Sequence, residues 1–316
     1  MMWFNSGQLV SSTWMVSMEL SYTSTVPRQL VHRQSVGEVF LTDYRLGDGT
    51  VDQIAVQLPA SHRIFRPTRQ RHDPLIVAEA FRQAVMMLCH TKYEVPPHFK
   101  FLMEQFGFDI VDELEVRSAP MPLILDMTTN QVDTRDGTAS RVDIAGVLRE
   151  GPRVLAYCNA VARCVTPAAY SRIRAGRDTS IAHFRAKPPG TVVIPAPCAG
   201  RAEEEDVLVA ANLPAGELYC APDPRNFALF DHPLDHIPGM VLFDAAIQAV
   251  RYRANDSSLQ LTRLAASFPI FTEWDDACDI AVSSAPPSHE RGRSCVTFMQ
   301  SARMTAQLDI TTTATS

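Results

Sequence analysis

The feature that most constrains the fold of this chain is an internal repeat of a helix that is apolar on nearly every side. The first copy, Leu75 to Leu88, carries one acid, Glu79, and the second carries Asp244. The pattern acid-Ala-x-x-Gln-Ala occurs in both copies, with Gln83 and Gln248 in matching positions. A helix that is apolar on all faces is buried in a core. Self-similarity between the two segments therefore predicts two copies of one structural unit.

Short β-like runs flank both helices in the same order. They lie at Val51–Leu58, Val111–Val116 and Arg153–Val165 in the first half, and at Val207–Leu213, Leu259–Phe268 and Ser294–Leu308 in the second. The pattern predicts an α+β fold in which each half has a curved antiparallel sheet around one long buried helix.

A second repeat follows the helices. Arg153 to Arg163 and Arg293 to Arg303 both begin with Arg and end with Ala-Arg at the same spacing. These two runs lie closer together in the chain than the two helix acids do, so the first half carries extra residues after its helix. We assign this extra length to the turn-rich stretch from Pro120 to Pro152.

A chain of 316 residues has the length of about two domains. Proline-rich segments around Lys187 to Gly190 and Pro195 to Pro197 interrupt the periodicity and mark a linker. The predicted organisation is an N-terminal tail over residues 1–25, a first repeat over 26–173, a linker over 174–203, a second repeat over 204–311 and a C-terminal tail over 312–316.

Composition excludes several classes of protein. The net charge of -6 argues against a nucleic-acid groove, which carries a basic field. No apolar run approaches the roughly 20 residues of a membrane span, and the N-terminus lacks the basic region of a signal peptide. The seven scattered cysteines contain no CxxC pair, which predicts reduced, mostly buried thiols in a cytoplasmic protein.

Several motifs together resemble a known family. In order along the chain they are Val31-His32-Arg33, Glu38-Val39-Phe40-Leu41-Thr42-Asp43, Glu79-Ala80-Phe81-Arg82-Gln83, His90, Val95-Pro96 and Asp231-His232-Pro233-Leu234-Asp235-His236-Ile237-Pro238-Gly239-Met240. Over roughly residues 26 to 310 they are similar to the two repeats of the A-factor (γ-butyrolactone) synthase family. The second repeat also resembles hydroxyacyl thioester dehydratases. The resemblance implies a tandem hotdog fold.

The same resemblance implies a reaction. Family members transfer a β-ketoacyl group from a thioester of acyl carrier protein or coenzyme A to dihydroxyacetone phosphate, and ring closure gives a phosphorylated butenolide. It implies no membrane or nucleic-acid partner, and either a monomer built as a pseudo-dimer or a homodimer. A hotdog dehydratase or thioesterase is the alternative function, and a non-catalytic protein that binds acyl thioesters is a second alternative.

The acid of the first helix is the main candidate for chemistry. A buried carboxylate is costly unless it is paired or neutral, and burial should raise the pKa of Glu79 towards a value useful to a general base. Arg82 and Gln83 lie one turn away, where Arg82 could hold a phosphate or orient the acid. A purely structural pair between Glu79 and Arg82 is the competing interpretation.

The second helix departs from the family pattern, which has Glu-Ala-x-Arg-Gln where this chain has Asp244 and Ile247. That difference makes a decayed second repeat the competing interpretation. Over the two repeats, the predicted catalytic residues are Glu79, Arg82 and Asp244, and the predicted substrate contacts are Gln83, His232, Gly239 and Gln248.

The two helix starts also differ. The N–H groups at Gly239 could polarise a thioester carbonyl, whereas Pro74 in the matching position has no N–H. From the related dehydratases we expect one composite site that combines Glu79 with His232 and Gly239. The opposite site, with Asp244 and Pro74, is expected to be weak or inactive.

No metal or cofactor is predicted. His232 and His236 are four residues apart but have no third ligand nearby in sequence, and His90 is expected to be a structural histidine. The sequence contains neither G-x-x-x-x-G-K-[ST] nor G-x-G-x-x-G, so we expect no nucleotide cofactor.

Overall fold

The structure is a computed structural model that describes residues 19–48, 51–68, 70–177, 187–232, 234–284 and 291–314. Residues 1–18 of the predicted N-terminal tail, 178–186 of the predicted linker and 315–316 at the C-terminus lie outside the described residues.

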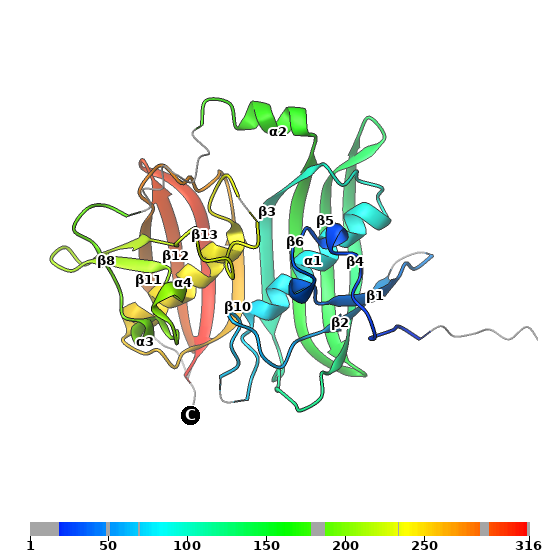
Figure 1. The fold of residues 1–316 in the computed structure, drawn as a ribbon, viewed down its shortest axis with the longest axis horizontal. Helices are drawn as coiled ribbons and strands as arrows, with labels where there is room; N and C mark the ends of the chain where they lie inside the picture. The colour runs from blue at the N-terminus through cyan, green and yellow to red at the C-terminus, as the bar shows by residue number, and fades with distance from the viewer. Residues whose placement is uncertain are drawn as a thin grey trace, which may run out of the picture.

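Two long helices form the centres of the two halves (Figure 1). Helix α1 spans Leu75–Thr91 and helix α4 spans Gly239–Ala254. Both are buried over most of their length, as their apolar sequences predict. The other helical elements are short, namely α2 (Pro167–Ile173), α3 (Ala196–Ala199) and the 3-10 turns at Arg28–Val31, Val36–Glu38 and Glu204–Asp206.

The strands of the described residues form one antiparallel sheet of thirteen strands. In the first half they are β1 (Leu41–Arg45), β2 (Asp52–Gln57), β3 (Lys100–Ile110), β4 (Pro122–Arg135), β5 (Thr138–Glu150) and β6 (Arg153–Val165). In the second they are β7 (Val192–Val193), β8 (Val209–Asn212), β9 (Glu217–Cys220), β10 (Gln260–Ser267), β11 (Asp279–Ser284), β12 (Arg291–Gln300) and β13 (Arg303–Thr313). Their order is β1-β2-β4-β5-β6-β3-β10-β13-β12-β11-β9-β8-β7, which confirms the predicted sheet around one helix in each half.

The two halves join through an antiparallel pairing of β3 with β10. Phe108 lies opposite Leu264, and Gly107 lies opposite Ala265. A side chain at Gly107 would come within 2.7 Å of the Asn159 side chain and 3.2 Å of the Leu264 carbonyl. Glycine therefore lets the two central strands approach with their neighbours in place.

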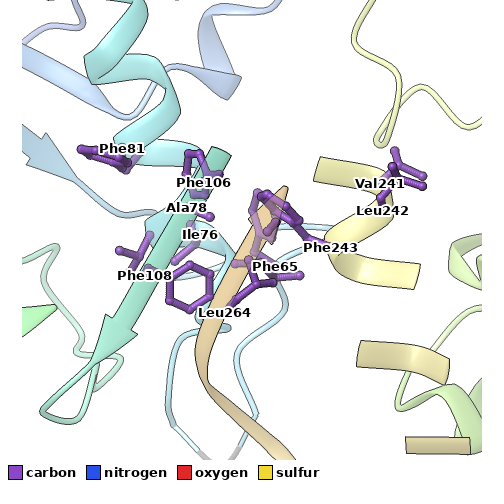
Figure 2. Close-up of a cluster of buried hydrophobic side chains, with 14 of the residues drawn as sticks. Phe65, Ile76, Ala78, Phe81, Phe106, Phe108, Val241, Leu242, Phe243 and Leu264 are labelled. Carbon is purple, nitrogen blue, oxygen red and sulfur yellow. The ribbon is translucent and has the colours of Figure 1, made fainter. Parts of the chain in front are cut away.

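Aromatic rings connect the two helices across this junction (Figure 2). The ring of Phe106 on β3 lies 5.6 Å from Phe81 on α1 and 5.3 Å from Phe243 on α4, measured between centroids. All three side chains are buried. Because rings at these separations are both buried and in direct contact, they fix the position of α1 relative to α4.

The structure corrects three details of the sequence interpretation. Residues 111–116 form no strand, because β3 ends at Ile110 and the chain turns away. The run from Ser294 to Leu308 is a hairpin of two strands. The residues assigned to a turn-rich stretch are mostly the long hairpin of β4 and β5.

The repeat that begins at Arg293 is also displaced from its structural equivalent. Arg153 begins β6, and Arg303 begins the matching last strand, β13. Arg293 lies instead within β12, so Arg303 is the true counterpart of Arg153. The shared letters are therefore a coincidence of spacing, because arginine and alanine recur on several strands.

The described part of the connection between the halves contacts the second half. Helix α2 lies over one end of the junction (Figure 1), and Arg174 just after it donates two hydrogen bonds to the Glu273 carboxylate at 2.8 and 2.7 Å. Tyr170 on α2 donates to Asp235 at 2.7 Å. Within the predicted linker, β7 pairs with β8, so this short segment forms one edge of the sheet in the second half.

No helix in the described part of the chain combines the length and the apolar character that a membrane crossing needs. The cysteines form no disulfide, and five are buried, namely Cys89, Cys158, Cys164, Cys220 and Cys278.

We predict that Phe106→Ala destabilises the whole protein by about 3–5 kcal/mol, because it leaves a cavity between α1, β3 and α4. Tyr157→Ala is the control, since Tyr157 is an aromatic residue on β6 with 51% of its surface exposed. Its loss should cost less than about 1 kcal/mol. Chemical denaturation measures both, and equal losses would contradict a core shared by the two halves.

Candidate functional site

The carboxylate of Glu79 is almost fully buried and is surrounded by cationic and polar donors. Arg82 donates from Nε to Oε2 at 2.8 Å and from Nη2 to Oε1 at 2.7 Å. Arg33 approaches Oε1 with Nη2 at 2.6 Å, and Gln83 donates to the same oxygen at 2.7 Å. The result is one anion that holds two guanidinium groups in fixed positions.

The predicted rise in the pKa of Glu79 is wrong. Burial does act to raise the pKa, but the charges of Arg33 and Arg82 outweigh it and lower the pKa to about 2. An acceptor with so low a pKa is a poor general base at neutral pH. The side chain of Glu79 is also 1% exposed and lines neither cavity described below. In the structure the Glu79 carboxylate contacts Arg33, Arg82 and Gln83.

The two glutamines of the repeat support the backbone. Gln83 accepts a hydrogen bond from Phe40 N at 3.0 Å and donates to Glu38 O at 2.7 Å. Gln248 makes the matching two bonds in the second half, to Leu208 N and Asp206 O. Both amides are buried and are engaged by these backbone groups.

Sequence reasoning did not identify the arginine that pairs with each helix acid. Arg33 pairs with Glu79, and Arg201 pairs with Asp244. The signal was present, because an acid follows each arginine at the same spacing, Glu38 in the first half and Asp206 in the second. Each arginine also follows a short helical turn that ends in a left-handed residue.

The second acid has lost one partner. Ile247 stands where the first helix has Arg82, which binds the second oxygen of Glu79. The corresponding oxygen, Oδ2 of Asp244, is buried without a hydrogen-bond partner among the described residues. A buried orphan of this kind is costly, so the second helix retains the structural pair with Arg201 but lacks the second guanidinium.

A cavity of about 820 Å³ lies between the two halves, and three of the predicted site residues line it, namely Arg82, His232 and Gly239. From the first half, Arg33 and Arg82 line it. From the second half, His232 and Gly239 line it. The two cations held by Glu79 thus share one cavity with the histidine loop and helix start of the other repeat, whereas Glu79 itself does not line it.

His232 and its neighbour Asp231 connect the halves. Asp231 accepts hydrogen bonds from the backbone N–H groups of Gln34 and Ser35, at 2.6 and 3.2 Å. His232 Nδ1 lies 3.6 Å from Asp231, beyond hydrogen-bond distance. Burial is the main cause that lowers the pKa of His232, and the nearby Arg33 adds to it. The lowered pKa favours the uncharged imidazole, although the charge of Asp231 opposes this effect.

Gly239 is the first residue of α4 and lies against the cavity. A side chain there would have its Cβ 3.2 Å from the Phe268 ring and 3.3 Å from the Met103 sulfur. Phe268 and Met103 also line the cavity. Glycine therefore keeps the helix N-terminus, with its free N–H groups, open to a bound molecule.

The equivalent space at the other acid is smaller, about 280 Å³. Pro74, Asp73 and Arg201 line it. Arg201 lies between Asp244 and Asp73 and is 7% exposed. The two cavities thus differ in volume, and Pro74 lines the smaller one whereas Gly239 lines the larger.

His236 is engaged by Asp235 at 2.7 Å. No cluster of three or more His, Cys, Asp or Glu side chains suited to a metal ion occurs in the described ranges.

Comparison with known proteins gives concordant results. A family model described as the A-factor biosynthesis hotdog domain matches residues 17–166 and 185–316. The 2-oxo-3-(phosphooxy)propyl 3-oxoalkanoate synthase of Streptomyces coelicolor is 31% identical over 263 residues, which cover 83% of this chain and 82% of that protein. The synthase of the same name from Streptomyces virginiae is 31% identical over 276 residues, covering 86% and 91%.

The fold also matches solved structures. A structure described as an oleoyl thioesterase of Lactobacillus plantarum has a TM-score of 0.50 at 7% identity, covering 85% of this chain and 98% of its own. At this identity the likeness concerns the fold alone. With the family model, it confirms the predicted tandem hotdog architecture.

We predict that Glu79→Gln destabilises the protein by about 3–5 kcal/mol at neutral pH, because it leaves buried Arg33 and Arg82 without their counter-ion. The pKa of Glu79 is about 2 when folded, below its ordinary value of 4.5. The stabilisation is therefore complete above pH 4.5 and is lost as pH falls towards 2. Unfolding free energies measured against pH should converge for the two proteins over this range.

Glu203→Gln is the control for this comparison. Glu203 forms an exposed pair with Arg66 at 3.4 Å, with about half of its side chain in solvent. Its replacement should change stability by less than about 1 kcal/mol. A gap between wild type and Glu79→Gln that stays constant to about pH 3 would contradict the lowered pKa.

Proposed function

The chain belongs to the A-factor biosynthesis hotdog family, and from that premise we propose that it is an acyltransferase of the A-factor synthase type. The name of its relatives specifies a product, the ester of a 3-oxoalkanoic acid with a 2-oxo-3-(phosphooxy)propyl group. For this chain the substrates are a β-ketoacyl thioester, of acyl carrier protein or coenzyme A, and dihydroxyacetone phosphate. The reaction takes place in the cytoplasm.

The observation that carries this proposal is the pair of guanidinium groups at the cavity wall. Arg33 and Arg82 line the cavity, and the Glu79 carboxylate, which does not line it, forms ion pairs with both. Arg82 also contacts the Met86 sulfur through Nη1 at 2.8 Å, and a thioether is a weak acceptor. A phosphate oxygen is a stronger one, so the phosphate of dihydroxyacetone phosphate fits here.

The thioester fits at the start of α4. The N–H groups at Gly239 and Met240 have no intrahelical partner, and the helix dipole adds positive potential. They suit the oxygen of a thioester carbonyl as it becomes negative in the tetrahedral intermediate. His232 lies on the same cavity wall as a neutral imidazole that can bind either substrate.

The rest of the cavity suits an acyl chain. Apolar side chains line it beyond Gly239, namely Leu229, Leu234, Leu242, Ile270 and Phe271. Apolar lining with a few convergent polar groups is the usual composition of a small-molecule site.

The chemistry is a balanced acyl exchange. The hydroxyl oxygen of dihydroxyacetone phosphate attacks the thioester carbon, the carbon–sulfur bond breaks, and the hydroxyl proton ends on the thiol. Ring closure of the ester then joins its activated carbon to the ketone with loss of water, which gives the phosphorylated butenolide. Asp244 and the smaller cavity take no part in this scheme.

The first test is product analysis of the purified wild type with both substrates. Mass spectrometry should detect the phosphorylated ester or butenolide only when dihydroxyacetone phosphate is present. Thioester hydrolysis or dehydration at the same rate without that substrate would contradict the proposal and favour the dehydratase or thioesterase alternative. Binding without turnover would favour the scaffold alternative.

We predict that Arg82→Met raises KM for dihydroxyacetone phosphate by about tenfold to a hundredfold, the loss of one charged hydrogen-bond donor. KM for the thioester should change by less than about threefold. Ile247→Met is the matched control, because Ile247 occupies the equivalent position of the second helix and lines the smaller cavity. Steady-state kinetics with each substrate varied in turn measures both effects, and equal effects on both KM values would contradict a phosphate site at Arg82.

We predict the opposite pattern for Gly239→Val. The new side chain meets Phe268 and Met103 and narrows the cavity at the helix start. KM for the thioester should rise by about tenfold or more, while KM for dihydroxyacetone phosphate changes little. The same kinetic series measures it, and an unchanged KM for the thioester would contradict the placement of the carbonyl at α4.

A further inference from the structure

A histidine occupies a strained turn at the wall of the large cavity. His32 has a φ of 51°, in the left-handed region that few residues other than glycine adopt readily. The equivalent turn of the second half has Gly200, with a φ of 69°. A side chain held at such a position against its own preference points to a function. His32 lines the cavity beside Arg33 and Arg82.

Hydrogen bonds fix where the protons lie on this ring. His90 Nδ1 lies 2.6 Å from the carbonyl oxygen of Val95, which can only accept, so Nδ1 carries a proton. In the neutral ring His90 Nε2 is then an acceptor. Nε2 of His32 lies 2.8 Å from it and must donate. His32 Nδ1 is therefore the unprotonated nitrogen, and it is the ring nitrogen that remains to contact a bound molecule.

The surroundings keep His32 neutral. Burial is the main cause that lowers its pKa to about 4, followed by the charges of His90, Arg82, His232 and Lys100. These groups come from α1, from the loop before α4 and from β3. Above about pH 5, the cavity thus contains a fixed proton acceptor close to the cations that would hold the phosphate.

We propose that His32 and His90 form the proton relay of the acyl transfer, with His32 Nδ1 as the group that contacts the substrate hydroxyl. The inference rests on the proposed function. As the hydroxyl oxygen attacks the thioester carbon, its proton passes to His32 Nδ1, and the proton on His32 Nε2 passes to His90 Nε2. When the carbon–sulfur bond breaks, the reverse transfers deliver one proton to the thiolate, so both rings regain their starting state.

The second ring, that of His90, explains how His32 can act as a base although its pKa is low. A positive charge on His32 would lie close to Arg82 and Lys100, which disfavour it. The relay moves that charge to His90 in the last turn of α1, where its Nδ1–H already binds the Val95 carbonyl. The C-terminal end of a helix favours a cation. The two rings lie nearly end to end, with their Nε2 atoms 2.8 Å and their centroids 5.1 Å apart, which keeps the transfer distance short.

His32→Gly is the decisive variant, because glycine suits the left-handed turn and Gly200 occupies its structural equivalent. We expect kcat to fall by about 10²–10⁴-fold, with KM for both substrates nearly unchanged. Added imidazole should restore activity in proportion to its concentration, since it enters the space that the ring leaves. His98→Gly, which removes an exposed histidine, should keep full activity and show no response to imidazole.

His90→Phe keeps an aromatic ring at this position but removes the second proton acceptor. Its kcat should fall by a similar factor, and imidazole should not restore it because the space remains filled. An independent measurement is nitrogen NMR of the wild-type histidines without substrate. It should find His32 protonated at Nε2 and His90 at Nδ1.

The outcomes separate this inference from the proposed function. A wild type that makes no ester overturns the proposed function itself. A wild type that makes the ester, together with a His32→Gly variant of normal kcat, overturns only the relay. A His32 ring found protonated at Nδ1 overturns it as well, whatever the kinetics show.

Discussion

The cavity of this protein depends on the pairing of β3 with β10 at the centre of the sheet. Each half has its own helix and its own buried acid, but neither half contains a complete site. The pairing brings the cations of the first half, Arg33 and Arg82, against the helix start of the second half at Gly239. The rings of Phe81, Phe106 and Phe243 then fix the distance between the helices. Chemistry at the junction therefore requires both repeats to be folded and paired.

The two repeats share one polar framework but have different chemistry. Both halves retain the arginine, helix acid and glutamine that bind one another and the backbone. They differ at the positions that would meet a substrate, with Arg82 against Ile247 and Gly239 against Pro74. The shared part stabilises each half, whereas the different part gives the two cavities unlike linings.

The sequence predicts the fold because apolar helices and alternating strands are local patterns. Helix α1 and strand β6 lie where their residues indicate. The composite cavity followed from the order of motifs and the family resemblance. The pKa of Glu79 was predicted in the wrong direction, because its second cation, Arg33, lies far from it in the chain, before β1. Long-range pairs of this kind, and the proton positions on His32 and His90, follow only from distances between side chains.

The difference between the two helix starts affects which pairings of the halves can form the large cavity. If the first half were produced alone, the exposed edge of β3 would offer a surface on which a second copy could pair. In that homodimer each Glu79 cluster would face a helix that begins at Pro74, without the N–H that Gly239 supplies. Covalent linkage of two unlike copies therefore gives an arrangement that self-association of either copy cannot reproduce, and fragments of the two halves would have to complement each other to regain it.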